Sequence, residues 1–223
     1  MGWRDLTHIL TPGMPVFPGD PAYEQTPVFR LERDGFRETF LGLNSHTGTH
    51  MDAPAHLLAQ GETLDRMPLE RFFGRACVLD CGGCGTAIPR SLLERVEGEG
   101  PLDFLILSTG WEERWRRESY QTGFPVLTQQ GADYLVSLGL KGVGVDALSV
   151  DPAESAELPI HRTLLSGGLV LVENLRGLIP LRGTQVWFGA FPLAFVQADG
   201  APVRAVAYVD EMVGGNRVSA PSP

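Results

Sequence analysis

Short apolar runs that alternate with helix-forming segments constrain the fold of this 223-residue chain more than any other feature. The runs most typical of buried strands are 103–108, 142–145 and 169–172. A helix is expected from Thr128, a good N-cap, to Leu138, and another begins at Pro159. This alternation predicts an α/β fold, and antiparallel hairpins expected near both ends of the chain predict that its sheet is mixed.

Length and the distribution of proline and glycine indicate the domain organisation. No linker or internal repeat divides the chain, so 1–223 is expected to form a single domain. Five prolines and glycines between positions 12 and 19 predict a loop-like arm over 1–20. Charged residues in 111–117 indicate a helix with a solvated face there, and the tail 214–223 is expected to fray.

Composition excludes several classes of partner. The formal net charge is −9 at pH 7, with 18 Lys and Arg against 27 Asp and Glu. Nucleic acid and anionic membrane surfaces both require basic patches, so neither is expected as a partner. Residues 1–8 lack the apolar core of a signal peptide, and no apolar run is long enough to cross a bilayer. We therefore expect a soluble, cytoplasmic protein.

The three cysteines, Cys77, Cys81 and Cys84, form an odd, clustered set that is not typical of a secreted disulfide scaffold. Cys81 and Cys84 make a C-x-x-C pair, which could be redox-active or half of a zinc site. The pair encloses Gly82 and Gly83 and follows a strand-like run, so we interpret it as an incidental turn of reduced thiols.

The densest group of potential metal ligands lies early in the chain. Three of the five histidines occur there within eleven residues, together with an aspartate. These residues are His46, His50, Asp52 and His56. Imidazole nitrogen and carboxylate oxygen are the usual ligands of zinc-like ions in proteins. Such a group predicts a metal site rather than separate polar loop residues.

The spacing of this group favours an extended backbone. Alternate side chains of a strand share a face, so a strand would aim His46, His50 and Asp52 to one side. A helix would also bring the first two together, but the intervening Thr-Gly-Thr is a poor helix former. Pro54 should bend the chain, so that His56 approaches the same point from another direction.

A second half of the site is expected from the later part of the chain. Glu173 interrupts an otherwise apolar segment, and a buried carboxylate is costly unless it is paired or bound to a metal. His161 lies twelve residues earlier, with a helix–strand unit between the two. The alternatives are a salt bridge with an arginine for Glu173 and a backbone hydrogen bond for His161. Together with the first cluster, both residues favour the metal-site interpretation.

The segment from His46 to His56, His-Thr-Gly-Thr-His-Met-Asp-Ala-Pro-Ala-His, resembles the His-x-Gly-Thr-His-x-Asp-x-Pro-x-His signature of the cyclase family of metal-dependent hydrolases. The best-known activity of that family is bacterial kynurenine formamidase, or arylformamidase. Further matching pieces extend over most of the chain, at 17–20, 108–111, 142–151, 161, 173–175 and 200–204. The resemblance implies a swivelling β/β/α fold, usually assembled as a homodimer or homotetramer.

The resemblance also implies a site with two divalent metal ions per subunit. By this resemblance the first ion is bound by His46 and His50, the second by His161, and both by Asp52 and Glu173. His56 matches the proton-transferring residue of the family. Zinc is the first expectation for the ions, and manganese and iron also suit these ligands.

The expected reaction is hydrolysis of an amide C–N bond in a small molecule, with a metal-bound hydroxide as nucleophile and His56 as proton shuttle. Family members bind an aromatic ring of the substrate beside an aromatic residue of the arm, which is Phe17 here and typically Trp in the formamidases. Arylformamidase, which converts N-formylkynurenine to kynurenine and formate, is the leading activity. The alternatives are a lactam- or isatin-type hydrolase of the same family and a non-catalytic metal- or small-molecule-binding protein.

Overall fold

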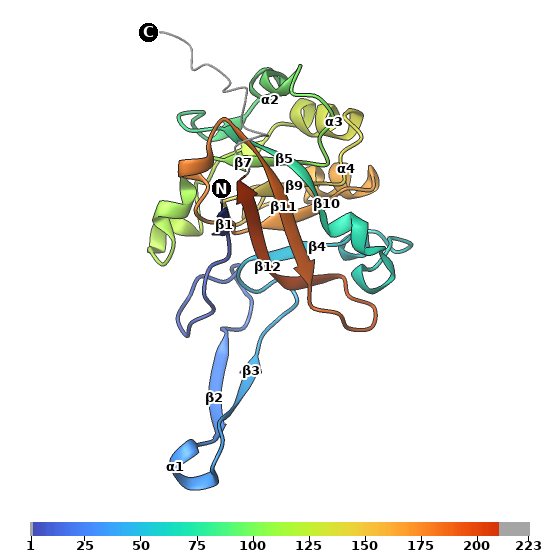
Figure 1. Cartoon of the computed structure of the whole chain (residues 1–223). Coiled ribbons are helices and arrows are strands. Elements are labelled where there is room, and N and C mark those ends of the chain that lie inside the picture. The colour runs from blue at the N-terminus through green and yellow to red at the C-terminus, as the bar shows by residue number, and fades with distance from the viewer. Residues whose placement is uncertain (1, 210–223) are drawn as a thin grey trace.

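The computed structural model describes residues 2–209 and is built around an eight-stranded sheet (Figure 1). The strand order is β1-β12-β11-β5-β7-β9-β10-β4, and β4 also pairs with β12, so the sheet closes on itself. In chain order the strands are β1 (Gly2–Asp5), β4 (His50–Asp52), β5 (Phe73–Asp80), β7 (Phe104–Ser108), β9 (Gly142–Val145), β10 (Val170–Glu173), β11 (Thr184–Pro192) and β12 (Gly200–Val209).

The sheet contains both parallel and antiparallel pairs, as expected. β5, β7, β9 and β10 run parallel to one another, whereas β1, β4, β11 and β12 form antiparallel pairs. Parallel neighbours need a crossover connection. α3 (Gln129–Ser137) lies in the crossover from β7 to β9, and α4 (Pro159–Ser166) lies in the crossover from β9 to β10. The predicted α/β fold with a mixed sheet is confirmed.

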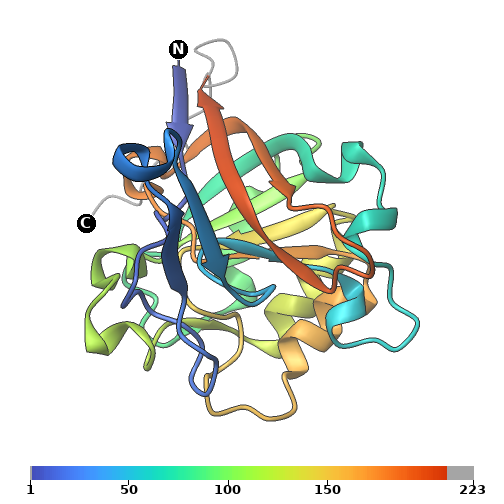
Figure 2. The same cartoon turned by 90° about the horizontal axis from the view of Figure 1, so that it is seen from below.

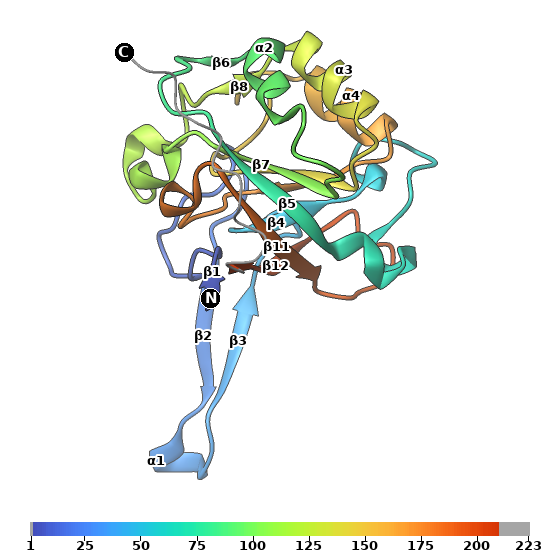
Figure 3. The same ribbon diagram turned by 45° about the horizontal axis from the view of Figure 1, so that its top comes forward.

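Helices cover one side of the closed sheet. α2 (Arg90–Leu93), α3 and α4 lie together above the strands in Figures 1 and 3. Along β7, Leu105 and Leu107 belong to the core beneath these helices, whereas Phe104 and Ile106 belong to the core enclosed by the sheet. Because both faces of the strand are buried, its sequence is continuously apolar rather than alternating.

The expected helix starts are confirmed. The Thr128 side chain accepts a hydrogen bond from the Gly131 N–H at 3.1 Å and so caps α3. Pro159 is the first residue of α4, where its missing N–H costs no helical hydrogen bond. Both signals depend only on neighbouring residues, so the helix starts could be predicted from the sequence.

The remaining elements are short. A parallel pair is formed by β6 (Ala87–Ile88) and β8 (Val126–Leu127). The 3₁₀ helices are Pro54–His56, Leu64–Arg66, Leu69–Phe72, Glu94–Val96, Trp111–Arg114, Glu118–Tyr120 and Ile179–Leu181.

A hairpin projects away from the closed sheet, opposite the helices (Figures 1 and 3). It consists of β2 (Glu24–Phe29), α1 (Leu31–Asp34) and β3 (Glu38–Gly42). Figure 2 looks at the molecule from this side. The hairpin carries several exposed apolar side chains, namely Val28, Phe29, Leu31, Phe36, Phe40 and Leu41.

Two local predictions were wrong. The expected arm over 1–20 is irregular only from residue 6 onward, because its first residues form β1 and pair with β12 at the edge of the sheet. The helix expected over 111–117 is only the 3₁₀ turn Trp111–Arg114. Arg116 has a left-handed backbone with φ 67°, which a continuing helix excludes.

The predicted frayed tail, 214–223, lies outside the described residues. In the described part of the chain, no helix has both the length and the apolar character that a membrane crossing requires.

Candidate metal and catalytic site

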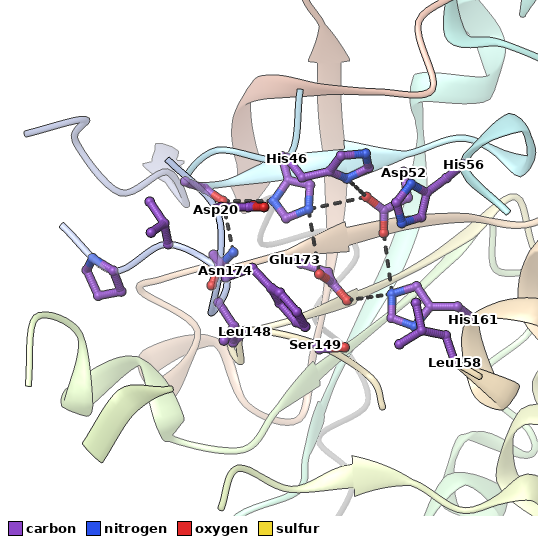
Figure 4. Close-up of a pocket in the computed structure, with 15 residues that line it drawn as sticks. Asp20, His46, Asp52, His56, Leu148, Ser149, Leu158, His161, Glu173 and Asn174 are labelled. Carbon is purple, nitrogen blue, oxygen red and sulfur yellow. Dashed lines mark hydrogen bonds and ion pairs between the residues drawn. The ribbon is translucent and has the colours of Figure 1, made fainter. Parts of the chain in front are cut away.

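A pocket of about 220 Å³ lies beside β4 and the end of β10 (Figure 4). Its lining includes every residue that the sequence singled out for the site: Phe17, His46, His50, Asp52, His56, His161 and Glu173. These residues come from the arm, from β4 and its flanking turns, from α4 and from β10. The two parts of the chain that were expected to meet therefore do meet.

The strand β4 supplies two of the candidate ligands, His50 and Asp52, which are two residues apart as predicted. His46 was expected in the same extended segment, but it lies in a turn before the strand. Gly48 separates the two with a left-handed φ of 69°, and a Cβ there would lie 2.6 Å from Leu10 Cδ2. The continuous strand was therefore a wrong prediction, although the turn carries His46 to the same point.

The other candidate residues reach the pocket from three directions. Pro54 begins a 3₁₀ turn that places the His56 ring 4.1 Å from the His46 ring, between centroids. Glu173 ends β10 and is the register partner of His50 on β4. His161 lies in the first turn of α4. The bend predicted at Pro54 is confirmed.

His46, His50 and Asp52 form the first group of possible metal ligands. The Asp52 Oδ1 atom lies 2.7 Å from His46 Nδ1 and 3.2 Å from His50 Nε2. Ligand atoms about 2.0–2.2 Å from one zinc ion are ~3–3.5 Å apart. The three atoms therefore fit around one cation.

Asp52, His161 and Glu173 form the second group. His161 Nε2 lies 3.2 Å from Glu173 Oε1 and 3.7 Å from Asp52 Oδ2. The other Glu173 oxygen, Oε2, lies 3.6 Å from His50 Nε2. Each carboxylate thus presents one oxygen to each group, which is the arrangement that two bridged cations require. The structure places His50 and His161 beside Glu173, rather than the arginine that was the alternative partner.

In each of the three candidate ligand histidines, the second ring nitrogen has its own partner. His46 Nε2 lies 3.0 Å from Asp199 Oδ2. His50 Nδ1 lies 2.9 Å from the Gly48 carbonyl oxygen, and His161 Nδ1 lies 2.8 Å from Asp151 Oδ2. Such partners fix the orientation of a metal-binding imidazole and decide which nitrogen faces the ion. They leave His46 Nδ1, His50 Nε2 and His161 Nε2 free to face the candidate metal positions.

Backbone packing leaves room for these rings. A Cβ on Gly200 would lie 2.4 Å from His46 Cε1, so glycine is required beside that imidazole. Asp151 also accepts the backbone N–H groups of Ile160 and His161 at 3.0 and 2.9 Å. It therefore holds the start of α4 as well as the His161 ring.

The charges of the ligand residues are strongly linked. Burial opposes a charge on His46, but Asp52 and Asp199 raise its pKa to about 9. Burial likewise opposes a charge on His161, but Asp151, Glu173 and Asp52 raise its pKa to about 10. Burial opposes ionisation of Asp52, yet His50 and His46 hold its pKa well below the usual range. Cations are therefore favoured among these carboxylates.

His56 has a different environment from the three candidate ligand histidines. It forms a further group with His46 and Asp199, in which neither Asp52 nor Glu173 takes part. Its Nδ1 atom lies 3.8 Å from Asp199 Oδ2. Burial lowers the pKa of His56 below its ordinary value, so its imidazole is neutral at pH 7. A neutral imidazole at the pocket wall can accept a proton.

Several apolar side chains line the pocket together with the candidate metal ligands. Phe17 of the arm lines the pocket together with Val16, Leu148 and Leu158. Phe17 is half-buried and packs against the core beneath the helices. The structure therefore places Phe17 both at the pocket and on the core.

Sequence reasoning missed Asp199 as a site residue and assigned no role to Asp151 or Asn174. Asp199 lies 153 positions from His46 and precedes β12, so no local spacing connects the two. Asp151 offered a weak signal, since it precedes His161 by ten positions in a segment that ends at a helix start. Asn174 follows Glu173 directly and lines the same pocket.

Comparisons with known proteins identify the family. A family model described as putative cyclase matches residues 4–152. The chain is also 32% identical over 216 residues to the kynurenine formamidase of Salinibacter ruber (strain DSM 13855 / M31), a match that covers 92% of this chain and 97% of that protein. The chain belongs to the cyclase family. The resemblance that the sequence motif predicted is confirmed.

Solved structures agree with this membership of the cyclase family. An isatin hydrolase bound to the product analogue thioisatinate has the same fold, with a TM-score of 0.84 and 23% identity over 94% of this chain and 92% of that one. A potential metal-dependent hydrolase with cyclase activity gives a TM-score of 0.78 and 27% identity over 92% and 96% of the two chains. The cyclase-like fold expected from the sequence is therefore confirmed.

The C-x-x-C pair lies apart from the residues of this pocket. Cys81 is buried and Cys84 is half-buried, and both are free thiols. The Cys84 N–H donates to the Cys81 carbonyl at 3.4 Å, as in the expected turn. Burial raises the pKa of both thiols, which opposes thiolate formation.

Proposed function

We propose that this cyclase-family protein is a two-metal amide hydrolase that converts N-formylkynurenine to kynurenine and formate. The observation that carries the proposal is the sharing of two carboxylates between two histidine groups. Asp52 and Glu173 each present one oxygen to each group, at distances of 2.7, 3.2, 3.2, 3.6 and 3.7 Å from the histidine nitrogens.

Membership of the family, with this set of residues in place, makes the chain a hydrolase that acts on C–N bonds. The identity and the number of the metal ions belong to the proposal. We infer zinc as the first choice and manganese as the second, because the donor atoms are imidazole nitrogen and carboxylate oxygen. When bound, such ions lower the pKa of a coordinated water to about 7 and polarise a carbonyl oxygen.

The chain's own residues provide the proton transfer. His56 lies at the pocket wall beside His46, and its neutral imidazole can take the proton of the attacking water. The C–O bond forms as the C–N bond breaks, and the same imidazole returns the proton to the leaving nitrogen. Asp199 lies beside both rings and orients the pair.

The pocket suits an aromatic amide of modest size. Phe17, Leu148 and Leu158 give the pocket an apolar surface that an aryl ring can contact. The described residues that line the pocket include no lysine or arginine. Its recognition of a substrate therefore relies on apolar contact, on the metal site and on the carboxylates.

Ring opening of a cyclic amide such as isatin is the second candidate activity. Two observations favour it: the fold matches isatin hydrolases, and the aromatic residue of the arm is Phe17 rather than the larger Trp. Phe17 has a smaller ring than Trp and lacks the indole N–H, so the feature typical of the formamidases is missing from this arm. Both reactions use the same attack on an amide carbonyl.

Turnover by zinc- and manganese-loaded protein tests these proposals. Formation of kynurenine from N-formylkynurenine supports the first activity, and ring opening of isatin with no formamidase activity supports the second. The metal-free protein and the His56→Ala variant are the controls, and both should be inactive or nearly so. Metal binding without turnover of either compound would contradict the hydrolase proposals.

We also propose that the chain assembles with copies of itself, as a homodimer or homotetramer. Phe36 and Phe40 of the projecting hairpin are 49% and 58% exposed, and an isolated two-stranded hairpin is marginally stable in water. A second copy of the chain could cover this surface. Light scattering should give more than one subunit for the wild type and a smaller species for Phe40→Asp. A monomeric wild type at micromolar concentration would contradict this proposal.

A cytoplasmic location is proposed as well, because all three cysteines are free thiols in the structure. Cell fractionation followed by immunodetection tests it, and recovery in a secreted fraction would contradict it.

A further inference from the structure

A buried chain of hydrogen bonds runs from Tyr120 to the metal-ligand candidate His50. The Tyr120 Oη–H donates to Asn174 Oδ1 at 2.7 Å, and Asn174 Nδ2 donates to the Gly48 carbonyl at 2.9 Å. The same carbonyl accepts the His50 Nδ1–H at 2.9 Å. Figure 4 shows Asn174 at the pocket, near Glu173. Tyr120 itself is 0% exposed and does not line the pocket.

The chemistry of the groups decides which atom donates and which accepts in each of these hydrogen bonds. A carbonyl oxygen only accepts, so the Asn174 amide must turn its NH₂ toward Gly48 and its oxygen toward Tyr120. Burial, together with Asp146, Glu173 and Glu112, raises the pKa of Tyr120 well above its ordinary value. The phenol therefore remains a donor throughout the physiological range.

The backbone around Asn174 is organised for this contact. Asn174 has a left-handed φ of 56°, which asparagine tolerates better than most residues. Its carbonyl accepts the Thr49 hydroxyl at 2.6 Å, and that hydroxyl accepts the His8 N–H at 2.9 Å. Asn174 thus ties the end of β10 to the Gly48 turn through both its side chain and its backbone.

Apolar packing alone does not account for Tyr120. Its ring packs edge-on against Trp115, with centroids 4.9 Å apart, and phenylalanine would fill that space equally well. A buried hydroxyl is costly unless it is hydrogen-bonded, and the partner of this one is Asn174. The hydroxyl group therefore has a role beyond filling the core.

We propose that Tyr120 and Asn174 are positioning residues that hold the Gly48 carbonyl, and through it the His50 ring, with Nε2 facing the first metal position. This inference rests on the proposed metal site but not on any particular substrate. A partner of this kind typically sets metal affinity by 10- to 100-fold. Asn174 acts directly on the carbonyl that His50 uses, and Tyr120 acts one step further away.

Zinc affinity, measured on the full chain by competition with a chelator, tests the proposal. Asn174→Gly keeps a residue that accepts the left-handed backbone and removes the amide, and it should weaken the binding of one zinc ion about tenfold. Tyr120→Phe should weaken the same ion by a smaller factor. The double variant should bind zinc no more weakly than Asn174→Gly alone, because both substitutions break the same series of hydrogen bonds.

Two matched variants serve as controls. Tyr134→Phe removes a phenol that bonds Glu97 outside the site, and Arg116→Gly relieves a left-handed backbone with φ 67°. Neither should change zinc affinity. Tyr134→Phe shows what loss of a phenol hydroxyl does to thermal stability, and Arg116→Gly shows what a glycine does at a left-handed position. Unfolding midpoints then separate loss of stability from loss of affinity.

The His50 ring gives a readout that needs no metal. In the metal-free protein, the Nδ1 proton of His50 should exchange with solvent faster in Asn174→Gly and Tyr120→Phe than in the wild type, by NMR. Unchanged proton exchange and zinc affinities within twofold of the wild type in both folded variants would overturn the proposal. Additive losses of zinc affinity in the double variant would contradict the claim that Tyr120 acts on the Gly48 carbonyl through Asn174. Failure of the hydrolase proposal alone would leave both readouts intact.

Discussion

Zinc binding to the metal-free protein should release about two protons per chain near neutral pH. The pKa of His46 is about 9 and that of His161 is about 10, because neighbouring carboxylates outweigh the effect of burial. Both imidazoles are therefore protonated on both ring nitrogens, and positively charged, in the metal-free protein. A histidine binds a metal as neutral imidazole, so each must lose that proton when the two ions bind.

The magnitude follows from the two pKa values. At pH 7.5, a group with a pKa of about 9 or 10 is more than about nine-tenths protonated, so each site contributes nearly one proton. Asp52 adds none, because its pKa lies well below the usual range. These two histidines alone should therefore make the product of the two zinc affinities rise about a hundredfold per pH unit between pH 6.5 and 8.

Isothermal titration calorimetry in two buffers with different ionisation enthalpies measures the number of released protons directly. The Asp199→Asn variant is the control, because it removes one of the carboxylates that raise the pKa of His46. It should release fewer protons than the wild type. Release of less than about one proton per chain by the wild type, with two ions bound, would refute the reasoning.

Four further predictions concern single substitutions and pH. Asp52→Asn and Glu173→Gln should each reduce metal occupancy, and full metal content by elemental analysis would refute their bridging roles. His56→Ala should retain metal but lose about 10²- to 10⁴-fold in kcat, so a wild-type rate would remove His56 from the proton transfer. Phe17→Ala should raise KM for an aryl amide more than it lowers kcat, and steady-state kinetics would expose the opposite pattern. In the metal-free protein, the two histidines with raised pKa values should add stability that is fully present below about pH 6.5 and lost as the pH rises through 9 to 10. A free energy of unfolding in urea that increases over this pH range would contradict the prediction.

Much of the site could be predicted because its signals are local. His50 and Asp52 are two positions apart on one strand, and Pro54 bends the chain directly after them. Glu173 stood out because a carboxylate at the end of an apolar run needs a partner. These inferences use only neighbouring residues, and the structure brings the residues together as they require.

Other features depend on contacts between distant segments. Asp199 meets His46 across 153 positions, and Tyr120 meets Asn174 across 54. The segment 111–117 was expected to be a helix with a solvated face because of its charges, yet Trp111 within it is buried. The turn at His46 depends on a left-handed Gly48, and sequence spacing alone could not distinguish that turn from a strand.

The central claim is that Asp52 and Glu173 bridge two cations between the histidine groups. Anomalous diffraction from crystals of the zinc-loaded protein tests this claim most directly. We predict two zinc peaks, one beside His46 and His50 and the other beside His161, with an oxygen of each carboxylate directed at each peak. A single peak at the site, or peaks only elsewhere in the molecule, such as beside Cys81 and Cys84, would contradict the account.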